Sequence, residues 1–355
     1  MEHLLRRLPL LALLPLLLYA CASNPPTSRV PALSDGLYDS EFPNRSSSRQ
    51  LEEVMESVKR LSCIAYYQVY PFPANEKVKL HNVTPDLLEK YEKKSVFTNN
   101  STSGTGTVIY SSNRKLALLT CAHVVGFPDT LVTYYVDAER RLTDNVATIA
   151  FKKRQSNFVA TIQEGGDMSV LAIDPEADIA VLGMEYTEIP STKIPAFHYP
   201  LGKAKDLDWG DFVYLFGYPS GFKMVTKAIV SSPNKDKYGS FLVDAVFTRG
   251  FSGGICLAIR DGIPNFELVG IVKLVSAHSS YFVTPGKEYG SVEDDSSVPY
   301  TGNLYVERKT EIEYGISQAI PVERIREFLE DNSDLLARKG YSVTGLLGVS
   351  PAKGS

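Results

Sequence analysis

A glycine-rich stretch around Ser252 has the residue types that nucleophilic catalysis requires. Gly250 lies two residues before the serine, and two further glycines follow it directly. Glycine lets the backbone turn so that the N–H groups of Gly250 and Ser252 can point at one spot, where they would bind the oxyanion that forms when a serine attacks a carbonyl carbon. The stretch therefore predicts Ser252 as a nucleophile, with Gly250 and Ser252 as oxyanion-hole donors.

A serine nucleophile needs a base, and His123 is the best placed of the five histidines. It follows an apolar run, and the two small residues before it would let the imidazole lie at the mouth of a cleft. A buried carboxylate is costly unless it is hydrogen-bonded, and an imidazole N–H supplies such a partner. Asp178 begins an apolar run and is the expected acid, with Asp167 and Asp174 as alternatives.

The candidates follow one another in the order His123, Asp178, Ser252. The segment 250–254 also fits the Gly-x-Ser-x-Gly elbow of α/β-hydrolases, but those enzymes need the order serine, acid, histidine. After the serine only His278 remains, in a polar run, and the chain lacks alternating β and α segments. The order therefore argues against the hydrolase elbow.

Several motifs in this order resemble those of trypsin-like serine proteases of the HtrA/Deg type, over roughly residues 60–335. They are the Leu-Thr-Cys-Ala-His of 119–123, the Asp-Ile-Ala-Val-Leu of 178–182, the Gly-Asp…Gly-Tyr-Pro hairpin of 210–219, the nucleophile stretch 244–254, and the closing segments 268–272 and 314–321. The resemblance implies an all-β, chymotrypsin-like fold: two six-stranded antiparallel β-barrels with a C-terminal helix, and a catalytic triad between the barrels. Ser252 would attack the scissile carbonyl, His123 would take and return the proton, and Asp178 would orient the imidazole.

The hydrophobic pattern agrees with a mostly β chain. A helical stripe covers 51–61, a Thr-Pro-Asp sequence starts a helical insert near 82–96, and a last helix runs from 321 to about 338; residues 279–305 are expected to form a polar loop. The short runs expected as strands are 64–70, 106–110, 116–119, 132–136, 147–151, 178–184, 212–216, 241–247, 255–259 and 268–274.

Two positions depart from the family pattern. Phe251 replaces the Asn or Asp that usually precedes the serine, and it either packs to fix the oxyanion loop or leaves that loop inactive. Lys273 stands where the family has a small hydroxyl beside the acid; its ammonium either competes for Asp178 or points to solvent. Val246 and Phe247 suggest an apolar substrate pocket and cleavage after small or medium apolar residues.

The N-terminal 20 residues have the features of an export signal: two arginines and then an apolar run too short to span a bilayer comfortably. The run ends at Cys21 in a sequence that resembles a bacterial lipobox, which implies a lipoprotein signal peptide over 1–20 and a lipid on Cys21; an ordinary cleaved secretory signal is the alternative. Residues 21–50 are expected to be a flexible tether, which would hold the protease in the bacterial cell envelope, in the periplasm or at the surface, with outer-membrane anchoring favoured.

The remaining composition narrows the function further. The mildly acidic net charge of −4 argues against a nucleic-acid partner, and no spacing typical of a metal site occurs, so neither metal nor cofactor is expected. Cys63, Cys121 and Cys256 are expected to be buried free thiols. One protease domain is expected over 51–338, followed by a loose tail over 339–355 and no PDZ domain.

We therefore predict a serine endopeptidase, with an acyl-enzyme intermediate, that acts on protein or peptide substrates of the cell envelope. A catalytically impaired protease fold used as a binding module (a pseudoprotease) is the alternative, since Phe251 and Lys273 would then mark lost chemistry. A generic esterase is a third reading. HtrA relatives are often trimeric, which makes a homo-oligomer a further expectation, although no trimer-specific stripe is found.

Overall fold

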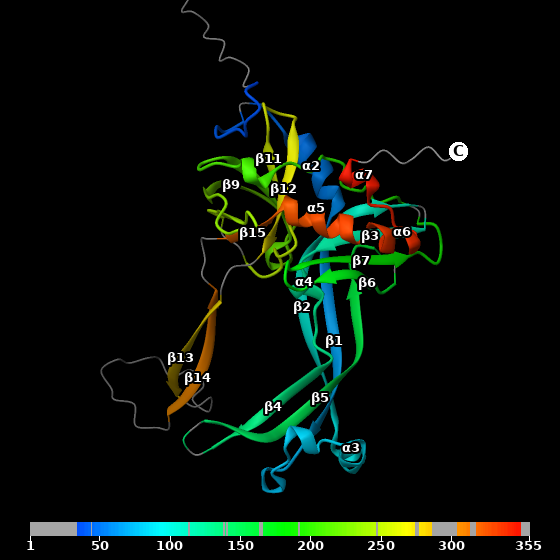
Figure 1. Cartoon of the computed structure of the whole chain (residues 1–355), viewed down its shortest axis with the longest axis vertical. Coiled ribbons are helices and arrows are strands. Elements are labelled where there is room, and N and C mark those ends of the chain that lie inside the picture. Colours follow the sequence, from blue (N-terminus) through cyan, green and yellow to red (C-terminus); the bar gives the residue numbers. More distant parts are fainter. Residues whose placement is uncertain are drawn as a thin grey trace, which may run out of the picture.

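A computed structural model confirms the all-β fold class: two β units lie side by side, and the helices are few (Figure 1). None of the helices in the described part of the chain is long and apolar enough to cross a membrane. The structure describes residues 34–43, 45–112, 114–137, 139, 141–162, 166–190, 192–245, 248–273, 277–285, 304–312 and 317–348.

The first unit is a seven-stranded antiparallel sheet that curls on itself, in the order β4-β5-β1-β2-β3-β7-β6. The expected six-stranded barrel is therefore wrong in detail for this unit, because the sheet has a seventh strand and does not close. Its strands are β1 (Val58–Pro71), β2 (Val96–Ser111), β3 (Lys115–Thr120), β4 (Thr130–Val136), β5 (Leu142–Phe158), β6 (Ser169–Asp174) and β7 (Ile179–Glu185).

The second unit is the expected six-stranded barrel, closed in the order β10-β15-β12-β11-β8-β9. Strands that face the interior on both sides, such as β8 and β11, are buried along their whole length, as their unbroken apolar runs predict. The strands are β8 (Phe212–Gly217), β9 (Met224–Ser232), β10 (Phe241–Val243), β11 (Ile255–Ile259), β12 (Phe266–Lys273) and β15 (Ser317–Pro321).

One continuous apolar core lies under both units, and it includes buried side chains of β3, β7, β8 and β11. The three cysteines are free and buried, as predicted. The helix α5 (Val322–Asp331) packs on β12 and β15, and α6 (Ser333–Arg338) follows it, in agreement with the expected last helix.

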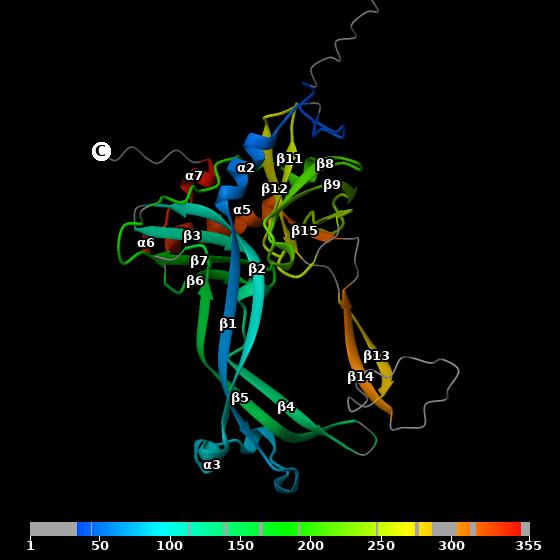
Figure 2. The same ribbon diagram turned by 180° about the vertical axis from the view of Figure 1, so that it is seen from behind.

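The longest strands of the first unit run past its body and form an arm (Figures 1 and 2). The arm consists of β4 and the outer parts of β1, β2 and β5, and it has a small core of its own around Tyr70, Phe72, Tyr91 and Ile149. The predicted helical insert lies at its tip as α3 (Pro85–Tyr91), whose N-terminus is capped by Thr84 Oγ1 accepting from the Leu87 N–H at 3.3 Å.

The described parts of the predicted tether and of the predicted tail are packed more closely than expected. Within the predicted tether, Tyr38 is buried, its hydroxyl donates to Glu267 at 2.7 Å, and Arg260 lies over its ring at 4.0 Å. At the other end, α7 (Thr344–Leu347) buries Leu346, so this part of the predicted tail belongs to the body. These contacts are made by single apolar side chains in polar segments. Such side chains form no periodic pattern, so the sequence did not predict that they are buried.

Three expected elements differ in extent. The helix expected over 51–61 is α2 (Ser48–Ser57). Strand β1 begins at the next residue, because buried and more exposed residues largely alternate from there on, as in a strand. The strand expected over 241–247 is only three residues long in the described part. The predicted polar loop 279–305 begins and ends within strands β13 (Ala277–Pro285) and β14 (Leu304–Ile312), which pair as a hairpin.

Candidate active site

His123 lies in α4 (Ala122–Val125), a single helical turn that directly follows β3. The strand is fixed between β2 and β7 by antiparallel pairing, and the Ala122 N–H donates to the Asp178 carbonyl at 3.1 Å. The turn therefore holds the imidazole next to the segment that carries the candidate acid.

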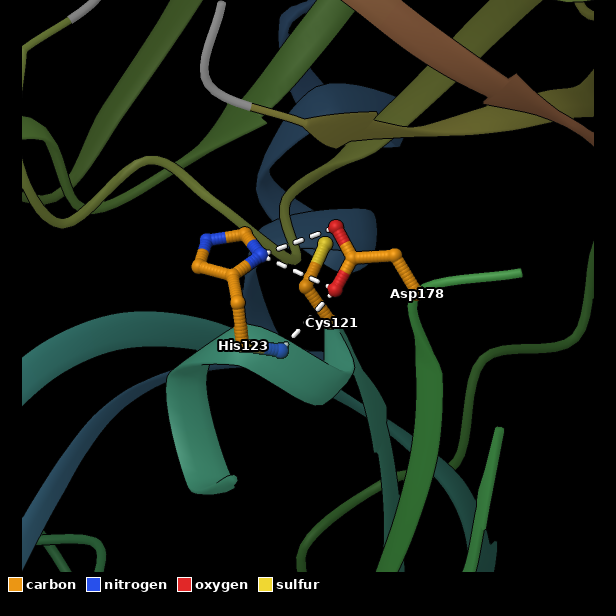
Figure 3. A group of neighbouring side chains, drawn as sticks. All are labelled: Cys121, His123 and Asp178. Atoms are coloured by element: carbon orange, nitrogen blue, oxygen red, sulfur yellow. Dashed lines mark hydrogen bonds and ion pairs between the residues drawn. The ribbon is translucent and has the colours of Figure 1, made fainter. Parts of the chain in front are cut away.

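The His123 imidazole and the Asp178 carboxylate form a closely paired group (Figure 3). Nδ1 of the ring lies 3.0 Å from Oδ1 and 2.9 Å from Oδ2, and the backbone N–H of His123 donates to Oδ1 at 2.9 Å. The carboxylate is 6% exposed, whereas the imidazole is 42% exposed. This geometry selects the tautomer with the proton on Nδ1, and leaves Nε2 as the nitrogen that can accept a proton.

Asp178 is held in an unusual backbone conformation at the end of the turn between β6 and β7. Its φ of 60° lies in the left-handed region, which aspartate tolerates better than most residues do. Burial by itself would raise the pKa of the Asp178 carboxyl, but the hydrogen bonds and charge of His123, together with the charge of Lys273, outweigh it and lower the pKa below its usual value. The carboxylate is therefore charged at neutral pH. The alternative acids bind elsewhere: Asp167 pairs with Arg154, and Asp174 accepts from the Glu176 N–H.

The structure answers which way Lys273 points. Its Nζ lies 3.5 Å from Asp178 Oδ2, the oxygen that also faces the imidazole. The last residue of β12 thus brings a cation to the acid where the family has a small hydroxyl. Because the lysine side chain is 38% exposed, water screens part of this interaction.

Cys121 is the third potential ligand near this pair, since its sulfur, His123 and Asp178 offer donor atoms within 4.8 Å of one another. Burial, reinforced by the charge of Asp178, raises the pKa of the Cys121 thiol well above its usual value. The thiol also donates a hydrogen bond to the Val272 carbonyl at 3.3 Å. A protonated thiol is a poor metal ligand, so these donors suit a hydrogen-bonded His–Asp pair better than a metal centre.

The loop that carries Ser252 is anchored to both units. The Ser252 carbonyl accepts from the Thr105 N–H of β2 at 2.8 Å, and the Gly253 N–H donates to the Val272 carbonyl of β12 at 2.9 Å. Gly250 has φ 100°, and a Cβ there would lie 2.5 Å from the Tyr218 carbonyl, so the position accepts only glycine without strain. Among the hydrogen bonds of the described residues, none uses the N–H of Gly250 or of Ser252, which leaves both free to donate.

Thr105 is a supporting residue that sequence reasoning missed. Its hydroxyl donates to the Gly250 carbonyl at 2.8 Å and accepts from the Tyr218 N–H at 3.0 Å, so one side chain fixes the Gly250–Phe251 peptide, which lies between the two proposed oxyanion donors. The sequence predicted a strand over 106–110, directly after this residue, but nothing in it indicated that Thr105 would reach the loop.

Phe251 packs inside the second barrel. Its side chain is buried, and its ring lies close to Gly217 at the end of β8. The loop also closes a tight turn at this residue, because the Gly254 N–H donates to the Phe251 carbonyl at 2.9 Å. Of the two alternatives for Phe251, this contact matches the one in which the aromatic ring packs to fix the loop.

Ser252 itself is buried, and within the described part of the chain its hydroxyl makes no hydrogen bond with His123. Such bonds are often long in a free enzyme and tighten when substrate binds. The predicted substrate-pocket residues Val246 and Phe247, and the predicted lipid site Cys21, lie outside the described residues.

Comparison with known proteins agrees with this geometry. Residues 104–271, which include all three triad candidates, match the family model of the trypsin-like peptidase domain. The curated relatives include probable periplasmic serine endoproteases DegP-like from Pseudomonas fluorescens and Pseudomonas fulva, each 30% identical over 123 residues. The alignments cover 33% of this chain and 22% and 23% of the relatives, so the chain spans less than a quarter of their length. Residues 104–271 are therefore similar to the trypsin-like peptidase domain, and the chain is similar in sequence to DegP-like serine endoproteases.

Proposed function

We propose that the chain is a serine endopeptidase that hydrolyses peptide bonds through an acyl-enzyme. The observation that carries this proposal is the His123–Asp178 pair, with Nδ1 at 2.9 Å from Oδ2 and an Nε2 free to accept a proton. A buried, ionised carboxylate behind an exposed imidazole is the arrangement that a serine nucleophile needs.

In the proposed reaction, Ser252 Oγ attacks the scissile carbonyl carbon while His123 Nε2 takes the hydroxyl proton. The oxyanion accepts hydrogen bonds from the N–H groups of Gly250 and Ser252. The carbonyl of the first peptide, that of Arg249, accepts from the Ser220 N–H, and the carbonyl of the second, that of Phe251, accepts from the Gly254 N–H. His123 then gives the proton to the leaving amine, and the same steps with water release the acyl group. Removal of one oxyanion donor typically lowers turnover by about 10²–10³.

The finer features remain proposals that rest on sequence. Val246 and Phe247 favour cleavage after small or medium apolar residues. A lipid on Cys21 would hold the protease at a bacterial membrane, with envelope proteins as substrates. The DegP-like relatives are named as probable periplasmic enzymes, which is consistent with such a compartment.

A fluorophosphonate probe on the purified chain tests the proposal, with Ser252→Ala as the matched control. Labelling of the wild type but not of the variant, together with release of peptides from an unfolded protein substrate, is the expected result. A peptide-library digest dominated by cuts after Lys or Arg would contradict the apolar pocket.

The second candidate is a pseudoprotease, and two observations favour it. The Lys273 ammonium forms an ion pair with one oxygen of Asp178, and Ser252 is not hydrogen-bonded to His123 within the described residues. If the probe fails to label the wild type under any condition, including in the presence of added unfolded protein, the endopeptidase proposal is refuted and the binding module stands.

A further inference from the structure

Four cationic residues lie on three segments that meet beside the Ser252 loop. The segments are the start of β1, the turn after β8 that contains Pro219–Gly221, and the stretch before the nucleophile. We name this surface the basic rim; its cations are Lys59, Arg60, Lys223 and Arg249.

Hydrogen bonds fix the turn after β8 to the nucleophile loop. The Ser220 N–H donates to the Arg249 carbonyl at 2.7 Å, and the hydroxyls of Ser220 and Thr248 lie 3.0 Å apart. Arg249 directly precedes the proposed oxyanion donor Gly250. This part of the basic rim therefore adjoins the reacting atoms.

The start of β1 brings the other cations to the same turn. A Cβ built on Gly221 would lie 2.9 Å from the Arg60 guanidinium, so Arg60 covers this glycine. Lys59 is half-buried and close enough to Lys223 to feel its charge: burial lowers the pKa of Lys59, the Lys223 charge lowers it further, and Glu56 acts in the opposite direction.

Glu56 is thus the acid that partly balances Lys59, while the other three cations keep their charge available. Arg60, Lys223 and Arg249 are exposed, and in the described part of the chain their side chains make neither an ion pair nor a hydrogen bond. A local excess of positive charge on a chain with a net charge of −4 attracts a negatively charged partner. Phe222 lies between these cations in sequence and is 70% exposed, which adds an apolar contact.

We propose that the basic rim binds an acidic segment of the polypeptide substrate, with Asp or Glu side chains a few residues from the scissile bond and an apolar residue against Phe222. This rests on the proposed endopeptidase function and adds a specificity to it. An extended chain advances about 3.3 Å per residue, so an acidic residue within a few positions of the cut can reach Arg249 and the turn beside it. Because the basic rim lies next to the nucleophile loop, a polypeptide substrate is favoured over a membrane surface as its ligand.

The test uses peptide binding to Ser252→Ala, which needs no catalysis. The probes are a fluorescent ten-residue peptide of Ala, Phe and Glu and the same peptide with each Glu replaced by Gln, both measured by fluorescence anisotropy. At low salt we expect the Glu peptide to bind at least tenfold more tightly than the Gln peptide, and the difference to shrink in about 0.5 M salt because the charges are exposed. Equal binding of the two peptides would overturn the proposal.

A charge reversal of the basic rim supplies the second arm. Arg60→Glu with Lys223→Glu should remove the preference for the Glu peptide, whereas Lys153→Glu with Lys205→Glu, two exposed lysines elsewhere, should leave it. If both double variants lost the preference for the Glu peptide equally, the preference would come from the net charge of the chain alone, and the proposal would be refuted. Stronger binding of Ser252→Ala to phosphatidylglycerol vesicles than to the Glu peptide, lost on reversal of the basic rim, would assign the surface to a membrane instead.

The same variants in the chain with Ser252 intact separate this proposal from the proposed function. Fluorophosphonate labelling of Arg60→Glu/Lys223→Glu at the wild-type rate would show an intact nucleophile loop. If the wild type is not labelled, the endopeptidase proposal fails while the binding comparison remains decisive for the basic rim.

Discussion

Replacement of Lys273 by methionine isolates the effect of the cation beside Asp178. The Lys273 ammonium lies 3.5 Å from Oδ2, and His123 Nδ1 lies 2.9 Å from the same oxygen. In the proposed reaction the imidazole takes the Ser252 proton and becomes a second cation at this carboxylate. Methionine keeps most of the apolar stem without the charge, so the imidazolium that forms in the transition state should meet less repulsion. The variant should then react faster than the wild type with a fluorophosphonate.

The two distances set the size of the repulsion between Lys273 and the protonated imidazole. The nitrogens of Lys273 and His123 lie at most about 6.4 Å apart, the sum of both distances, and two unit charges there repel by about 2.6 kcal/mol at an effective dielectric constant of about 20. The side chains are 38% and 42% exposed, so screening by water lowers the repulsion to about 1 kcal/mol. Since about 1.4 kcal/mol corresponds to a factor of ten in rate, we expect labelling to be faster by up to about fivefold.

The assay is the rate of fluorophosphonate labelling at a fixed pH of about 8, because labelling depends on the base that takes the serine proton. Lys153→Met is the matched control, because that lysine is exposed on the arm and should leave the rate unchanged. A rate equal to that of the wild type would refute the electrostatic reasoning. A rate more than tenfold below that of the wild type would show instead that Lys273 holds Asp178 in place.

Three further substitutions test the loop and the N-terminal segment. Gly250→Ala places a Cβ 2.5 Å from the Tyr218 carbonyl at φ 100°, so labelling should fall by about 10²–10³ while the circular dichroism spectrum is kept; normal labelling would contradict the assigned oxyanion donor. Thr105→Val removes both hydrogen bonds of the hydroxyl and should slow labelling by about tenfold or more, whereas Thr105→Ser should restore most of the rate; equal rates would exclude the positioning role. Tyr38→Ala should lower the free energy of unfolding in urea by about 3 kcal/mol and Tyr38→Phe by about 1 kcal/mol, and a loss under 0.5 kcal/mol for the alanine would show that the segment is only loosely docked.

The parts of the fold that could be predicted from the sequence are those with a local pattern. Apolar runs such as those of β8 and β11 indicate strands buried on both faces, and Thr84 before a proline indicates the start of α3. The proximity of His123 and Asp178, 55 residues apart, was expected from the resemblance, and the pairing of β3 with β7 brings it about.

The features that sequence reasoning left open or missed depend on register and on contacts between distant segments. Whether Lys273 meets Asp178 depends on how β12 aligns with its neighbours, and a shift of one residue would turn the side chain to the other face. Tyr38 packs against Arg260 and Glu267, more than 200 residues away, and the residues around it in the sequence show no pattern that predicts this contact. The polar composition of 279–305 predicted a loop, whereas its two ends lie in β13 and β14, whose pairing depends on backbone hydrogen bonds rather than on an apolar pattern.

The arm has a consequence for how this protein can diverge. Its small core around Tyr70, Phe72 and Tyr91 is distinct from the core beneath the two units, so a change in arm length or sequence requires no repacking around His123 or Ser252. Mutations in the arm should also be tolerated at a stability cost confined to a local opening rather than to global unfolding. Natural variation can therefore reshape the outer end of the molecule and leave its chemistry untouched.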